Sequence, residues 1–96
     1  MTHRDVFVVS TARTAIGTFG GSLKDVPNTQ LATTAVKAAI ARSGLAPDAV
    51  GHVVMGNVIP TDTKDAYLSR VAAIDAGCPI ETPAFNVNRL CGSGLQ

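Results

Sequence analysis

Asn88-Arg89-Leu90-Cys91-Gly92-Ser93-Gly94-Leu95-Gln96 follows directly on an apolar run over residues 83–87. The run predicts a buried strand, and the small residues after it predict a tight turn into the start of a helix. A side chain at such a turn projects where a substrate can reach it, as in the nucleophile elbow of hydrolases. Free backbone N–H groups and the positive end of a helix dipole favour a thiolate there. Cys91 is therefore the candidate nucleophile.

The neighbours of Cys91 favour a reactive thiol over the alternative of a small buried side chain. Gly92 and Gly94 fall in the expected first helical turn, where each costs about 1 kcal/mol relative to alanine. Glycine is useful where the backbone bends tightly or a substrate approaches closely. Asn86 and Asn88 alternate on the preceding strand, and one of them is expected to hydrogen-bond the loop that carries Cys91.

Strands and helices alternate along the rest of the chain. Residues 6–9 form a continuous apolar run, which predicts a strand buried on both faces of a parallel sheet. A glycine-rich loop over residues 12–26 follows. Asn28 or Thr29 is the expected N-cap of the first helix, and Gly44 is its expected stop.

The second half of the chain repeats this alternation. Residues 53–55 predict a second strand, which can extend as far as Ile59 before a proline ends it. Asp65 is expected to cap a second helix that Gly77 closes, and residues 83–87 are the third strand. The alternation predicts an α/β fold with a parallel sheet and right-handed crossovers. Three strands and two helices cannot cover both faces of a sheet, so we expect an incomplete domain.

The composition predicts a chain that is largely covered by other protein. Hydrophobic residues make up 46% and charged residues only 16%, which is too few for the surface of a free domain. The net charge is +1 with no basic stripe, which gives no support for a nucleic-acid partner. No apolar stretch is long enough for a membrane span or a signal-peptide core, so we expect a cytoplasmic protein without a membrane partner.

The other chemically active residues are assigned structural roles. Cys78 follows a helix stop and has no activating neighbour, and His3 and His52 are expected at the surface. The spacing of these cysteines and histidines fits no metal site. Residues 17–22 lack the signatures of a phosphate-binding loop and are expected to pack on neighbouring chain. Arg70 is expected at a subunit contact or in an internal ion pair.

Residues 88–96 resemble the nucleophile segment of the thiolases, which make and cleave 3-ketoacyl-CoA. The resemblance extends to four earlier segments, residues 8–17, 19–23, 54–58 and 70–77. These segments occur in the right order and cover essentially the whole chain. Residues 65–70 resemble the bacterial broad-chain β-ketothiolases more closely than the dedicated acetoacetyl-CoA synthesising members.

The resemblance implies a thiolase-like layered αβαβα architecture, in which residues 1–96 are an incomplete N-terminal domain and the C-terminal domain is absent. It implies that Cys91 carries the acyl group as a thioester and that its backbone N–H helps to bind the thioester oxyanion. Coenzyme A and acyl-CoA are the implied substrates, with no further cofactor and no metal, and the complete protein is expected to be a homodimer or homotetramer. The family's catalytic histidine and second cysteine have no counterpart in His3, His52 or Cys78. The isolated chain is therefore expected to be inactive.

Two other functions remain open. A non-catalytic thiolase-like polypeptide would bind a partner or a lipid, which suits the low surface charge. A ketoacyl-carrier-protein synthase also uses a cysteine on a similar architecture. Residues 8–23 disfavour that enzyme, because they resemble the thiolases specifically.

Overall fold

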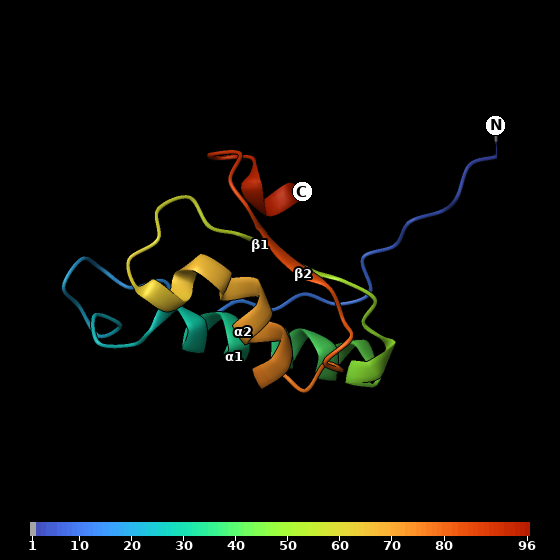
Figure 1. Ribbon diagram of the computed structural model, residues 1–96, viewed down its shortest axis with the longest axis horizontal. Helices are drawn as coiled ribbons and strands as arrows, with labels where there is room; N and C mark the ends of the chain where they lie inside the picture. The colour runs from blue at the N-terminus through green and yellow to red at the C-terminus, as the bar shows by residue number, and fades with distance from the viewer. Residues whose placement is uncertain (1) are drawn as a thin grey trace.

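The computed structural model describes residues 2–96 as two helices packed against a small parallel sheet (Figure 1). The helices are α1 (Asn28–Ser43) and α2 (Leu68–Asp75), and the strands are β1 (Val53–Gly56) and β2 (Ala84–Val87). Short 3₁₀ turns connect them: η1 (Pro47–Ala49), η2 (Thr63–Tyr67) and η3 (Ser93–Leu95). The predicted α/β alternation is thus present from residue 28 onward.

The first helix ends where the sequence predicts and begins one residue earlier. Gly44 follows α1 in the left-handed conformation, with φ 75°, which confirms it as the stop. Neither Asn28 nor Thr29 is the N-cap, because the helix begins at Asn28 and Pro27 precedes it in an extended conformation. The Asn28 amide instead donates to the carboxylate of Asp65, at 2.9 Å. A tertiary contact has therefore replaced the expected local cap.

The two strands pair in parallel, and α2 forms the crossover between them. The register aligns Val53 with Ala84 and Gly56 with Val87. The predicted extension of the first strand to Ile59 is wrong, because β1 ends at Gly56 and Ile59 is exposed. Both strands therefore end together, with Gly56 beside Val87. The turn that follows β2 begins at this carboxyl end of the sheet.

The predicted strand over residues 6–9 is not formed. The segment is extended but unpaired, and Val6 and Val8 are 92% and 85% exposed. A strand needs a hydrogen-bonded neighbour, and residues 6–9 instead belong to the N-terminal end that extends away from the helices (Figure 1). The Ser10 hydroxyl donates to the carbonyl of Ala39, at 2.6 Å, and fixes the end of the segment to the helix.

The second helical region also differs at its start. Asp62, not Asp65, is the N-cap of η2, and the two side chains form a reciprocal capping box. The α-helix proper begins at Leu68, after η2. Gly77 follows the end of α2 with φ 95°, which confirms the predicted stop.

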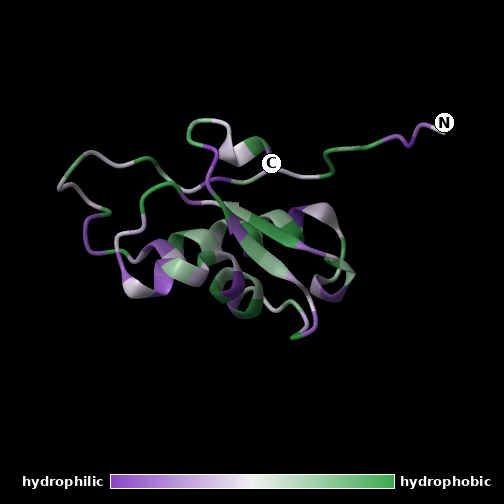
Figure 2. Cartoon of the chain, turned by 45° about the horizontal axis from the view of Figure 1, so that its top comes forward, coloured by the Kyte–Doolittle hydropathy of each residue, from purple (hydrophilic) through white to green (hydrophobic). Residues whose placement is uncertain are grey.

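Small side chains form the core. One cluster joins α1 to α2, and a second joins α2 to the sheet; their buried members are Ala32, Leu68 and Ala72, and Val53, Ala73 and Cys78. Both strands are mostly hydrophobic (Figure 2), yet Val54 and Phe85 remain 36% and 44% exposed. Within residues 2–96, no helix combines the length and the apolar character that a membrane span needs.

Candidate active site

Cys91 lies in the turn that follows β2, and it is exposed. The predicted helix start is present only as the 3₁₀ turn η3, which begins at Ser93 after Gly92. The thiol is therefore not at the end of an α-helix in the described chain.

The residue before Cys91 has an unusual backbone conformation. Leu90 has φ 50°, and it is the one non-glycine residue with positive φ in the described chain. This conformation costs a residue with a side chain roughly 1–2 kcal/mol. The Asn88 side chain supports it by accepting a hydrogen bond from the Leu90 N–H, at 3.0 Å. The expected asparagine contact with the cysteine loop is thus confirmed, and Asn88 makes it.

Asn86 has a different, structural role. Its carbonyl oxygen accepts from the Ser69 N–H, at 2.9 Å, and its amide donates to the Asp65 and Ala66 carbonyls, at 2.9 and 3.2 Å. These bonds join β2 to the start of α2 and to η2. Asn86 therefore fixes the strand that leads to Cys91 relative to the helix.

Asp65 is buried at the junction of α1 and η2. Hydrogen bonds, first from the Thr61 N–H and then from the Asn28 amide, hold the pKa of this carboxyl below its ordinary value. The Thr61 and Asn28 bonds are 2.8 and 2.9 Å long. Burial acts in the opposite direction, and the hydrogen bonds outweigh it. The cluster anchors the segment that follows β1.

The other cysteine and the histidines lie apart from the Cys91 turn. Cys78 is packed between α2 and the sheet, and burial raises the pKa of its thiol, which fits the predicted structural role. His52 precedes β1, at the end of the sheet opposite to the Cys91 turn. Its ring packs edge-on against the Phe85 ring, with the two ring centroids 5.0 Å apart. His3 is exposed in the N-terminal segment.

Arg70 was expected at a subunit contact or in an internal ion pair, and within residues 2–96 its guanidinium bonds to backbone carbonyls rather than to a carboxylate. Its guanidinium donates to the Ile80 carbonyl, at 2.7 Å, and to the Thr82 carbonyl, at 2.9 Å. These bonds hold the loop before β2 against α2. Among the side chains of residues 2–96, no group of three histidine, cysteine or acidic residues could hold a metal ion.

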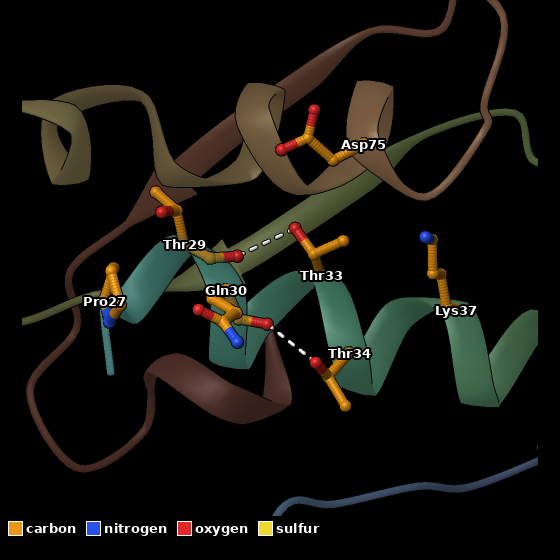
Figure 3. A pocket seen from close by; sticks show the side chains of 7 residues that line it. All are labelled: Pro27, Thr29, Gln30, Thr33, Thr34, Lys37 and Asp75. Carbon is orange, nitrogen blue, oxygen red and sulfur yellow. Dashed lines mark hydrogen bonds between the residues drawn. The ribbon is translucent and has the colours of Figure 1, made fainter. Parts of the chain in front are cut away.

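A broad groove on the helical side does not include Cys91. Its volume is about 560 Å³, and its lining residues come from α1, the residue before it and the end of α2 (Figure 3): Pro27, Thr29, Gln30, Thr33, Thr34, Lys37 and Asp75. The Thr33 and Thr34 hydroxyls already donate to the Thr29 and Gln30 carbonyls of the same helix. The hydroxyls of these two threonines are thus occupied, whereas the side chains of Gln30 and Lys37 line the groove with further donors.

Sequence reasoning gave no role to Ser93, which the structure places beneath the Cys91 turn. The side chain is 6% exposed, and its hydroxyl bonds to the backbone of Arg89 and Leu90. The available signal was a serine two residues after Cys91, between two glycines. That pattern alone does not show where the hydroxyl points.

The structure thus places an exposed thiol in a hydrogen-bonded turn after the second strand of a parallel α/β sheet. Residues 6–96 match the family model described as the N-terminal domain of thiolase. The chain belongs to the thiolase family, and the predicted layered α/β architecture is confirmed for the N-terminal portion that it matches.

Two relatives show how similar the chain is to thiolases. It is 60% identical to the beta-ketothiolase BktB of Cupriavidus necator over 93 residues, which are 97% of this chain and 24% of that protein. It is 46% identical to human mitochondrial 3-ketoacyl-CoA thiolase over 93 residues, which are 97% of this chain and 23% of that protein. The similarity to BktB supports the predicted resemblance to bacterial β-ketothiolases.

A solved structure gives the same result for the fold. The crystal structure of human mitochondrial 3-ketoacyl-CoA thiolase in complex with CoA matches with a TM-score of 0.90 at 46% identity, covering 94% of this chain and 23% of that one. The chain thus spans about a quarter of the length of these relatives.

Proposed function

We propose that this chain contributes the nucleophile of an acyl-CoA:acetyl-CoA C-acyltransferase that makes or cleaves 3-ketoacyl-CoA. Cys91 is the nucleophile. The observation that carries the proposal is the exposed Cys91 thiol in a turn supported by Asn88 and Ser93, in a chain of the thiolase family. The turn leaves the sulfur accessible while its backbone is held by hydrogen bonds.

In the cleavage direction, the Cys91 thiolate attacks the 3-keto carbonyl carbon of the substrate. The bond between C2 and C3 breaks, acetyl-CoA leaves as its enolate and takes up a proton, and the shortened acyl group stays on the sulfur as a thioester. The thiol of a second coenzyme A then attacks this thioester, and Cys91 is released. The backbone N–H of Cys91 helps to stabilise the oxyanion in these steps.

The proton transfers need groups other than the histidines and the second cysteine of residues 2–96. His52 lies at the opposite end of the sheet, His3 lies in the exposed N-terminal segment, and Cys78 is buried in the core. We therefore propose that residues 1–96 alone do not turn over substrate. The homodimer or homotetramer and the cytoplasmic location stay predictions.

The test uses the complete protein that contains this sequence. Its intact mass is measured under denaturing conditions after incubation with acetoacetyl-CoA. We expect an acetyl-sized increment that peptide mapping places on Cys91. Cys91→Ala should abolish both the increment and thiolysis, whereas the control Cys78→Ala should retain them. Thiolysis by folded Cys91→Ala would overturn the proposal.

A non-catalytic binding role is the second candidate, and the exposed apolar residues favour it. Val6, Ile16 and Phe19 are each at least 88% exposed. A polypeptide that binds acyl-CoA reversibly, with no covalent increment and no thiolysis, would support this role over catalysis.

A further inference from the structure

Gly56 and Ser93 are in unusually close contact. Gly56 ends β1, and a Cβ atom added there would lie 2.9 Å from the Ser93 Cβ and 3.2 Å from the Ser93 carbonyl carbon. Real Cβ atoms essentially never approach another atom within 3.0 Å. The absence of a side chain at Gly56 is therefore what lets η3 sit directly on the end of β1.

The Ser93 hydroxyl, in turn, holds the two residues that precede Cys91. It accepts from the Arg89 N–H, at 2.8 Å, and donates to the Leu90 carbonyl, at 2.7 Å. The Ser93 N–H donates to the same carbonyl, at 3.1 Å. Leu90 thus has its carbonyl fixed by Ser93 and its N–H fixed by Asn88. Such contacts can maintain a costly left-handed residue where the surrounding structure demands it.

We propose that Ser93, seated on Gly56, is a positioning residue for the Cys91 nucleophile. The inference rests on the proposed function of Cys91. Ser93 acts through the backbone of Leu90: the hydroxyl fixes the conformation from which the thiol projects. Nucleophilic attack depends strongly on this placement, since a shift of about 1 Å can slow a reaction by about 100-fold.

Ser93→Ala removes the hydroxyl and keeps the Cβ that packs on Gly56. The chain offers a matched control in Ser43, whose hydroxyl donates to the Ile40 carbonyl, at 2.6 Å, and accepts from the Leu45 N–H, at 3.1 Å. Ser43→Ala therefore breaks the same kinds of bond at the end of α1, in a different element from the Cys91 turn.

Gly56→Ala tests the same contact from the other side. The added methyl group must displace Ser93, although the substitution removes no polar group from the turn. Gly51→Ala is its control, because a Cβ at Gly51 meets no atom within 4 Å. Ser93→Thr keeps the hydroxyl and serves as the conservative variant.

The variants are compared in the intact polypeptide by kcat and KM for thiolysis of acetoacetyl-CoA, and by the rate at which iodoacetamide alkylates Cys91. We expect Ser93→Ala and Gly56→Ala to lower kcat about 10- to 100-fold. KM should stay within about threefold, because substrate binding does not depend on the exact position of the thiol. The alkylation rate should also stay within about threefold, because a small reagent can reach the thiol from many directions. Ser43→Ala and Gly51→Ala should keep the original kcat, and Ser93→Thr should recover most of it.

The outcomes separate this inference from the proposed function. If Cys91→Ala is inactive but Ser93→Ala keeps kcat within about twofold, Ser93 does not position the thiol and the function stands. If Ser93→Ala lowers kcat and the alkylation rate equally, its role is structural only and the inference fails. If Cys91→Ala is active, both fail. Should Ser93→Ala not fold, Gly56→Ala decides by the same criteria.

Discussion

The two cysteines differ in accessibility, which predicts different reactivity. Cys91 is exposed, whereas Cys78 is 6% exposed and its pKa is raised by burial. We expect iodoacetamide to label Cys91 rapidly and Cys78 slowly in the native chain, and both at similar rates in denaturant. Peptide mass mapping over a time course measures this. Equal labelling in the native state would contradict the buried environment of Cys78.

The raised pKa of Cys78 also has a consequence at high pH. The folded state keeps this thiol protonated, while the unfolded chain ionises near the ordinary value of 9.0. The stabilising effect of the neutral thiol is therefore complete below that value and is lost as the pH rises toward the folded pKa. Cys78→Ala should show a weaker decrease in stability above pH 9.0 than the original chain.

Asp65 predicts the opposite pH dependence. Its folded pKa is lowered, chiefly by the Thr61 N–H and then by the Asn28 amide. The carboxylate therefore stabilises the fold above its ordinary value of 3.8, and the contribution is lost as the pH falls through the folded pKa. We expect Asp65→Asn to lower the free energy of unfolding at neutral pH and to flatten its acid dependence.

Urea unfolding at neutral pH and below pH 3.8 measures the effect of Asp65→Asn. Asp75→Asn is the control, because Asp75 is an exposed carboxylate at the end of α2. If both variants keep the original dependence on pH, the Asp65 cluster does not contribute to acid stability.

At the scale of elements, Asn86 joins β2 to the start of α2. Asn86→Ala removes the bonds to Ser69, Asp65 and Ala66 at once, leaving backbone groups without their partner. We expect a loss of about 1–3 kcal/mol in the free energy of unfolding. Chemical denaturation measures it, and Gln30→Ala, at an exposed position on α1, is the control. Equal stability of the two variants would show that the hydrogen bonds of Asn86 do not stabilise the fold.

The elements that the sequence predicted correctly have local signals. Gly44 and Gly77 end their helices because each takes a left-handed conformation that glycine adopts readily. The parallel pairing of β1 and β2 follows from the helix between them. Residues 6–9 have an equally clear apolar pattern, but pairing depends on a neighbouring strand, and an apolar run cannot show whether one is present.

The candidate site was predictable from the sequence only where its residues are neighbours in the chain. Cys91 was visible because a strand, a turn and glycines surround it in sequence. Asn88 was one of two candidates for supporting its loop, and only the structure shows which contact forms. The contact of Gly56 with Ser93 joins residues that are far apart in the chain, so nothing in either local segment reveals it.

The molecule as a whole exposes much apolar surface. The sheet has two strands and open edges, and Phe7, Val8 and Phe85 are 76%, 85% and 44% exposed. Open strand edges pair readily with other chains, and a sheet of two strands is marginally stable alone. We therefore expect residues 1–96, expressed by themselves, to self-associate rather than remain a compact monomer.

Sedimentation velocity over a concentration series measures this association. Val8→Lys should shift the population toward the monomer, because a charged side chain on an extended apolar segment opposes pairing with another chain. Thr34→Lys adds the same charge at an exposed position on α1 and should leave the distribution unchanged. A monodisperse monomer with a sharp thermal transition in the original chain would show that the exposed apolar segment and sheet edges do not drive association.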